Sequence, residues 1–155
     1  FVSNNKKGPI SEAIIKIAKE YGFMDWLIMP GRVKANLVSD YYSIIDIAPF
    51  PRKSYLVTEM VRPMKLYEAM NMKKAVIVSS VDALKEMVVE NETALIFEKD
   101  NISSLSEMIE KMINNKNLRE EIAKNGKKFV MSKMNWNESI KDSLKQISKI
   151  VNVKL

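Results

Sequence analysis

The chain has 155 residues, of which 46% are apolar and 28% are charged, and its formal net charge is +6. This length and composition predict one globular domain and argue against a disordered chain. The sequence contains no cysteine and no histidine, which excludes disulfides, thiolate nucleophiles and imidazole acid–base catalysis. It also contains no Asp-x-Asp pair, the usual arrangement for a divalent ion held against a diphosphate. We therefore expect no metal site and no cofactor.

The beginning of the chain shows no targeting pattern. Its first residues, FVSNNKKGPI, include no initiator methionine and lack the charged-then-apolar order of a signal peptide. No apolar run approaches the roughly 20 residues needed to cross a bilayer. We expect a cytoplasmic segment that begins inside a longer protein.

The positive charge is concentrated at the end of the chain, where residues 101–155 hold eleven Lys and Arg against six Asp and Glu. Basic helices can bind nucleic acid, and such binding would depend steeply on salt concentration. Because these lysines are scattered rather than clustered, we favour solvated helical faces and no nucleic-acid partner.

Five short apolar runs have the length of β-strands, and amphipathic segments separate them. The runs are residues 1–3, 26–29, 44–50, 75–79 and 93–97. Strands that alternate with helices at this spacing predict an α/β fold, with a Rossmann-like parallel sheet of about five strands flanked by helices.

Helical periodicity predicts several helices between and after these strands. The expected helices are one after Gly8-Pro9 up to Tyr21, a short one over residues 37–41, one from Pro63 to Met70, one over 83–88, one over 102–113, one over 117–132 interrupted near Gly126, and one after Trp136. Methionines on these faces are expected to fill the core. No G-x-G-x-x-G follows any expected strand, which disfavours a dinucleotide oxidoreductase.

The segment TEMVRPMKLYEAM, residues 58–70, places Glu59 and Glu68 on either side of Arg62, Pro63 and Lys65. It follows an expected strand, and open parallel sheets bind ligands beyond the carboxyl ends of their strands. A helix N-terminus has unpaired N–H groups and a partial positive charge, so it attracts phosphate. The pattern favours an anion-binding helix start, although isolated glutamates at this spacing are more often surface or ion-paired residues.

With its surroundings, this segment resembles a known family. The stretch TEMVRPMKLYEAMNMKKAVIVSSVDALKEMVVENETALIF resembles the C-terminal, nucleotide-sugar-binding lobe of retaining glycosyltransferases with the GT-B architecture, of the glycosyl transferases group 1 or family 4 type. The segments GRVKANLVSDYYSIIDIAPFPRK and LREEIAKNGKKFV also look like this lobe. The resemblance implies a lobe over residues 1–133 without its first strand and helix, and a crossover helix over residues 134–155.

The resemblance also implies roles for individual residues. Glu59 would be the catalytic residue facing the donor sugar, and Glu68 would bind the ribose hydroxyls of the donor. Backbone N–H groups around Met64 and Lys65 would hold the diphosphate, with Arg62 adding positive charge. The loop at Arg32 and Val33 would lie against the base.

The implied function is hexosyl transfer from a nucleotide diphosphate sugar by an intact parent protein with an N-terminal acceptor lobe. The isolated chain would then be inactive. Eight residues separate the two glutamates where seven are usual, Ser80 stands for the usual Asp, and three customary glycines are replaced by Lys73, Asp82 and Ala94. These departures leave open a non-catalytic interaction module, or a truncated remnant that has kept the fold without the donor. Also left open are a homodimer of the isolated segment and a parent that is peripheral to a membrane.

Overall fold

The computed structural model describes residues 8–133, 140 and 144–148. The chain divides into two compact units, Phe1–Tyr41 and Tyr42–Leu155. Among the described residues, no helix is both long enough and apolar enough to span a membrane.

The regular structure of the first unit is helical where it is described. Helix α1, Pro9–Glu20, has proline in its first turn, and Ser11 and Ala18 are buried. Two short 3-10 turns follow, η1 at Met24–Trp26 and η2 at Ala35–Leu37. The second turn leads into α2, Val38–Ser43, which crosses from the first unit to the second.

The strand expected at residues 26–29 is wrong, because Trp26 ends the turn η1 and the next three residues have no regular structure. Apolar residues alone do not make a strand, since its backbone groups need a neighbouring strand for hydrogen bonding. The strand expected at residues 1–3 lies outside the described residues. The described sheet therefore has three strands and not the expected five.

The second unit is built on this sheet, whose order is β1-β2-β3 with every pair parallel. The strands are β1 at Ile47–Phe50, β2 at Ala75–Ser79 and β3 at Leu95–Phe97. Ile47 lies opposite Ala75 in the first pair, and Ile77 lies opposite Leu95 in the second. The parallel arrangement predicted from strand and helix alternation is confirmed.

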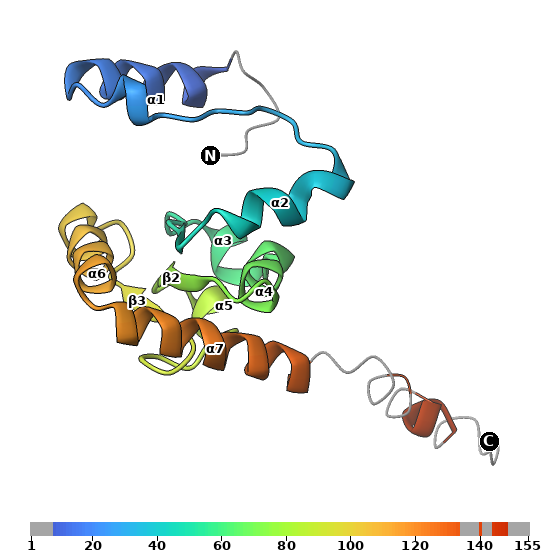
Figure 1. Cartoon of the computed structure of the whole chain (residues 1–155). Helices are drawn as coiled ribbons and strands as arrows, with labels where there is room; N and C mark the ends of the chain where they lie inside the picture. The colour runs from blue at the N-terminus through green and yellow to red at the C-terminus, as the bar shows by residue number, and fades with distance from the viewer. Residues whose placement is uncertain (1–7, 134–139, 141–143, 149–155) are drawn as a thin grey trace. The chain divides into compact units, whose positions relative to one another are not determined.

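Five helices accompany the sheet in this part of the chain. They are α3 (Leu56–Met60), α4 (Met64–Asn71), α5 (Asp82–Lys85), α6 (Ile102–Asn114) and α7 (Lys116–Lys133). In Figure 1, α7 runs beside β2 and α4, with which it is in contact. Of the helix expected after Trp136, residues 144–148 are helical and most of the rest lies outside the described residues.

Two apolar clusters form the core, one on each face of the sheet. Along the fully buried strand β2, Val76 and Val78 contribute to one cluster, while Ala75 and Ile77 contribute to the other. Side chains of a strand alternate between its faces, so this division shows that both faces of β2 are covered. Helix α7 reaches both clusters, with Val130 in the first and Ile122 in the second.

Helix α7 is continuous, so the interruption expected near Gly126 is wrong. Gly126 is buried, and a Cβ atom placed there would lie 3.4 Å from the Met70 side chain and 3.4 Å from the Thr93 carbonyl oxygen. The glycine therefore lies at the packed contact between α7 and α4 and does not break the helix.

Candidate functional site

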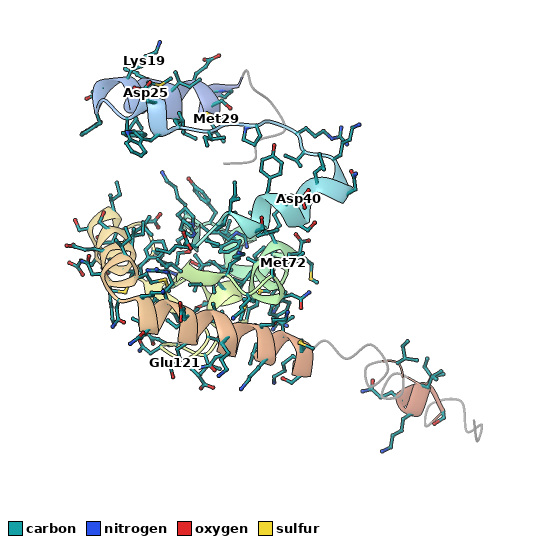
Figure 2. The ribbon with its side chains drawn as sticks, viewed as in Figure 1. Lys19, Asp25, Met29, Asp40, Met72 and Glu121 are labelled. Atoms are coloured by element: carbon teal, nitrogen blue, oxygen red, sulfur yellow. The ribbon has the colours of Figure 1, made fainter. Side chains whose placement is uncertain are left out.

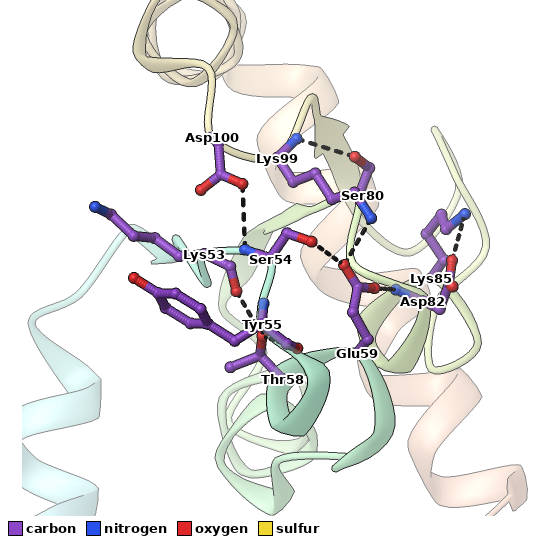
Figure 3. A network of polar contacts seen from close by, with 10 residues as sticks. All are labelled: Lys53, Ser54, Tyr55, Thr58, Glu59, Ser80, Asp82, Lys85, Lys99 and Asp100. Carbon is purple, nitrogen blue, oxygen red and sulfur yellow. Dashed lines mark hydrogen bonds and ion pairs between the residues drawn. The ribbon is translucent and has the colours of Figure 1, made fainter.

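The carboxyl ends of the three parallel strands lie at one edge of the sheet, and the loops that follow them meet there. These loops are residues 51–55 after β1, 80–81 after β2 and 98–101 after β3. Figure 3 shows that side chains from these loops join α3 in one polar network. Open parallel sheets bind ligands at this edge, which makes the network the candidate site.

Glu59, in α3, lies at the centre of this network. Its Oε1 atom accepts hydrogen bonds from Ser54 Oγ at 2.6 Å and from Lys99 Nζ at 2.6 Å. Its Oε2 atom accepts the backbone N–H of Asp82 at 2.7 Å. The carboxylate thus connects the loops after β1 and β3 with the start of α5, and 19% of the Glu59 side chain is exposed.

These contacts stabilise the ionised form of Glu59. They lower its pKa to about 2, with the hydrogen bond from Lys99 as the largest cause, followed by those from Ser54 and from the Asp82 amide. The hydrogen bond to Glu59 also raises the pKa of Lys99. A hydrogen bond to the charged form of a group favours that form. At neutral pH the site therefore contains a carboxylate and an ammonium group in direct contact.

Further hydrogen bonds fix the loops around this pair. Ser80 Oγ accepts the Lys99 backbone N–H at 3.0 Å, and Asp100 Oδ2 accepts the Ser54 backbone N–H at 3.3 Å. The Asp82 carboxylate is 64% exposed and pairs with Lys85 Nζ at 2.9 Å. Asp82 stands where the resemblance implies a glycine, and its backbone amide contacts Glu59.

Helix α4 begins four residues after the end of α3, as the sequence predicts, with Pro63 at its N-cap position. Met64 and Lys65 are exposed, and as the first two helical residues their N–H groups have no acceptor within the helix. Arg62 is exposed and forms an ion pair with Glu86. One of the two cations expected near a phosphate is therefore already paired on the surface.

Glu68 is not part of the Glu59 network. It is exposed on α4, four residues after Met64 and so on the same face of the helix. It lies close enough to Tyr42 for its charge to raise the pKa of that phenol, after the larger effect of burial. Its carboxylate makes no hydrogen bond to any residue in the described part of the chain. The two glutamates therefore differ in their surroundings: Glu59 is hydrogen-bonded within the network, and Glu68 is exposed on α4.

Arg32 and Val33 belong to the first unit, where Arg32 is exposed and Val33 is half-buried. They follow Gly31, whose φ of 76° is a left-handed conformation that glycine adopts readily. Their contact with the base stays a prediction.

Two members of the site, Ser54 and Lys99, are not among the residues that the sequence predicts. Both lie in loops that directly follow a strand. Lys99 comes two residues after Phe97, the last residue of β3. Their position directly after a parallel strand was the available signal. No known motif links a serine or a lysine to Glu59 at these spacings, and Lys99 lies 40 residues after Glu59 in the sequence.

Two other kinds of site, a metal centre and a pocket, are less well supported in the described structure than the Glu59 network. Among the described residues, no three or more acidic side chains come together in a group that could hold a metal ion. An open hollow of about 400 Å³ lies between α7 and Lys73, which is in the turn between α4 and β2. Its lining residues are Lys73, Asn117, Glu120, Glu121, Lys124 and Asn125. Glu121 is labelled on α7 in Figure 2. Lys73 precedes β2, so this hollow lies at the opposite edge of the sheet from the strand-end loops.

Comparison with known proteins identifies the family. Residues 7–129 match the family model of glycosyl transferases group 1. The chain belongs to this family. An uncharacterized glycosyltransferase of Methanocaldococcus jannaschii is 35% identical over 102 residues, a match that covers 63% of this chain and 29% of that protein. The chain thus spans less than a third of the length of this relative.

Solved structures show the same fold. The C-terminal domain of a glycosyl transferase group 1 family protein from Francisella tularensis has a TM-score of 0.69 at 23% identity, covering 80% of this chain and 62% of that one. Anabaena HepE, solved in complex with UDP, has a TM-score of 0.74 at 14% identity, covering 87% of this chain and 36% of that one. This member of glycosyl transferases group 1 therefore has the α/β fold of GT-B glycosyltransferases.

Proposed function

We propose that this chain is the C-terminal, nucleotide-sugar-binding lobe of a retaining glycosyltransferase. The observation that carries the proposal is the position of Glu59, where segments that follow all three parallel strands meet in a chain of this family. In this assignment Glu59 faces the donor sugar, and Glu68 accepts hydrogen bonds from the ribose hydroxyls. A carboxylate has two oxygens and can accept from both hydroxyls of a diol.

The start of α4 supports a diphosphate site. The helix presents the free N–H groups of its first residues at the strand-end edge, and Lys65 is exposed beside them. Helix N-termini bind phosphate through such groups, and fixed N–H donors and cations stabilise the charge that develops on a departing diphosphate. The complex of Anabaena HepE with UDP is consistent with a nucleotide donor here. We propose that this binding needs no metal ion.

Sugar transfer would need a second lobe that holds the acceptor. Positioning two reactants can supply roughly 7–11 kcal/mol of a barrier, and a single donor lobe cannot do this. We therefore expect these 155 residues alone to transfer no sugar, and a protein carrying both lobes to act as a hexosyltransferase.

One observation favours the alternative of an interaction module that no longer binds a donor. Glu59 already accepts three hydrogen bonds from within the chain, one of them from the backbone of Asp82, which stands where the resemblance implies a glycine. Binding measurements separate the two functions directly.

Calorimetric titration with UDP, GDP and ADP tests the proposal. We expect one of the three nucleotides to bind, with an affinity unchanged by EDTA. Glu68→Ala should weaken that binding about tenfold or more, because a hydrogen bond to a charged group is lost. Glu110→Ala, an exposed glutamate of α6, is the matched control and should leave binding unchanged. Silence with all three nucleotides would refute the donor-binding function and support the interaction module.

A further inference from the structure

Lys99 is the one cation in direct contact with the carboxylate that is proposed to face the donor sugar, within the described residues. It lies in the loop that follows β3, two residues after Phe97. Its ammonium group donates to Glu59 Oε1 at 2.6 Å, while its backbone N–H is held by Ser80 Oγ. With 37% of its side chain exposed, Lys99 is both anchored and accessible from solvent (Figure 3).

The hydrogen-bonding capacity of this pair is only partly used. A carboxylate offers about four lone-pair positions, and Glu59 accepts three hydrogen bonds. An ammonium group has three N–H donors, and in the described part of the chain Lys99 uses one of them. One acceptor position and two donors therefore remain side by side at the carboxyl edge of the sheet.

A sugar diol matches such a pair, because each hydroxyl both donates and accepts. One hydroxyl can donate to Glu59 while its neighbour accepts from Lys99, without breaking a contact seen in the structure.

The surrounding charges favour an uncharged sugar. The network contains three carboxylates, Glu59, Asp82 and Asp100, and two ammonium groups, Lys85 and Lys99. The ammonium group of Lys53 points away from it in Figure 3. This excess of negative charge would repel a sugar carboxylate, since like charges at close range disfavour binding.

We propose that Lys99 is a specificity-determining residue that, together with Glu59, binds two neighbouring hydroxyl groups of an uncharged donor sugar. This rests on the proposed function, since it takes Glu59 as the carboxylate that faces the sugar.

The test compares free nucleotides with nucleotide sugars by calorimetry. The probes are UDP, GDP and ADP, then UDP-glucose, GDP-mannose and ADP-glucose, with UDP-glucuronate as the acidic analogue of UDP-glucose. Lys99→Met should weaken the nucleotide sugar that the wild type binds about tenfold or more, the effect of losing a hydrogen bond from a charged donor. It should change the affinity for the corresponding free nucleotide less than about twofold. Lys111→Met, an exposed lysine of α6, is the matched control and should change neither.

Two further measurements distinguish a role in sugar binding from a structural defect and from a preference for an acidic sugar. Lys99→Arg keeps a charged donor and should recover part of the lost affinity, whereas a purely structural defect of Lys99→Met would weaken both kinds of ligand. If the wild type binds UDP-glucose, it should bind UDP-glucuronate more weakly.

The possible failures are distinguishable. If no nucleotide binds, the proposed function fails, and the role of Lys99 fails with it. If nucleotides bind but no nucleotide sugar does, or if Lys99→Met weakens both equally or neither, the donor lobe stands and the role of Lys99 in sugar binding is refuted. Preference for UDP-glucuronate would overturn the assignment to an uncharged sugar.

Discussion

Replacing Gly126 by alanine tests the packing between α7 and the core. Gly126 lies within a continuous helix, where glycine is about 0.8–1.0 kcal/mol less favourable than alanine. The new Cβ atom would lie 3.4 Å from Met70 Cε, 3.4 Å from the Thr93 carbonyl oxygen and 3.6 Å from Met70 Cγ. These are ordinary van der Waals distances, close to the optimum of about 3.5–4.0 Å between carbon atoms. The space thus accepts one methyl group without displacing backbone.

We therefore expect Gly126→Ala to increase the free energy of unfolding by about 0.5–1 kcal/mol, because the gain in helix propensity is retained. For a chain of this size the midpoint of thermal unfolding should rise by roughly 2–4 °C per kcal/mol. Gly126→Val is the contrasting variant. Its γ-methyl groups would extend towards atoms already in contact with Cβ, so it should destabilise by about 1–3 kcal/mol.

The measurement is urea unfolding followed by circular dichroism at 222 nm, supported by thermal melts of the three proteins. A loss of more than about 1 kcal/mol in Gly126→Ala would refute the assignment, since it would mean that α7 packs too closely against α4 for any side chain at this position. Equal stability of Gly126→Ala and Gly126→Val would show instead that α7 does not pack against Met70 and Thr93 at this position.

Three further predictions follow from single contacts. The lowered pKa of Glu59 means that its ionised form stabilises the fold fully above about pH 4.5, and that this contribution is lost as the pH falls towards about 2. The free energy of unfolding should therefore fall less steeply over this pH range in Glu59→Gln than in the wild type, and an equal pH dependence of the two proteins would contradict the network. Asn101→Ala removes the side chain that caps α6 by accepting the Ser104 N–H at 3.0 Å, and should cost about 1 kcal/mol in urea unfolding; no measurable loss would argue against the cap. Arg62→Ala should change stability by less than about 1 kcal/mol, because its ion pair with Glu86 is exposed on both sides, whereas a larger loss would indicate a structural role.

Much of the fold of the second unit could be predicted from local sequence patterns. The runs at residues 44–50, 75–79 and 93–97 contain β1, β2 and β3, because short apolar runs between helical repeats favour buried parallel strands. Pro63 predicted the start of α4, since proline is tolerated at a helix start and not in its interior. The same pattern failed at residues 26–29, where apolar residues have no strand beside them in the described structure.

The candidate site divides in the same way. Sequence by itself determined that Glu59 and the start of α4 follow a strand at the ligand-binding edge, because both features depend on residues close together in the chain. Only the tertiary structure decided which groups meet Glu59. Ser54 and Lys99 lie in two different loops and Asp82 is the first residue of α5, and the parallel sheet brings these three segments to one edge. The physical reason is that hydrogen bonds and charge pairs act over a few ångströms in space, whereas periodicity and capping report only on neighbours in sequence.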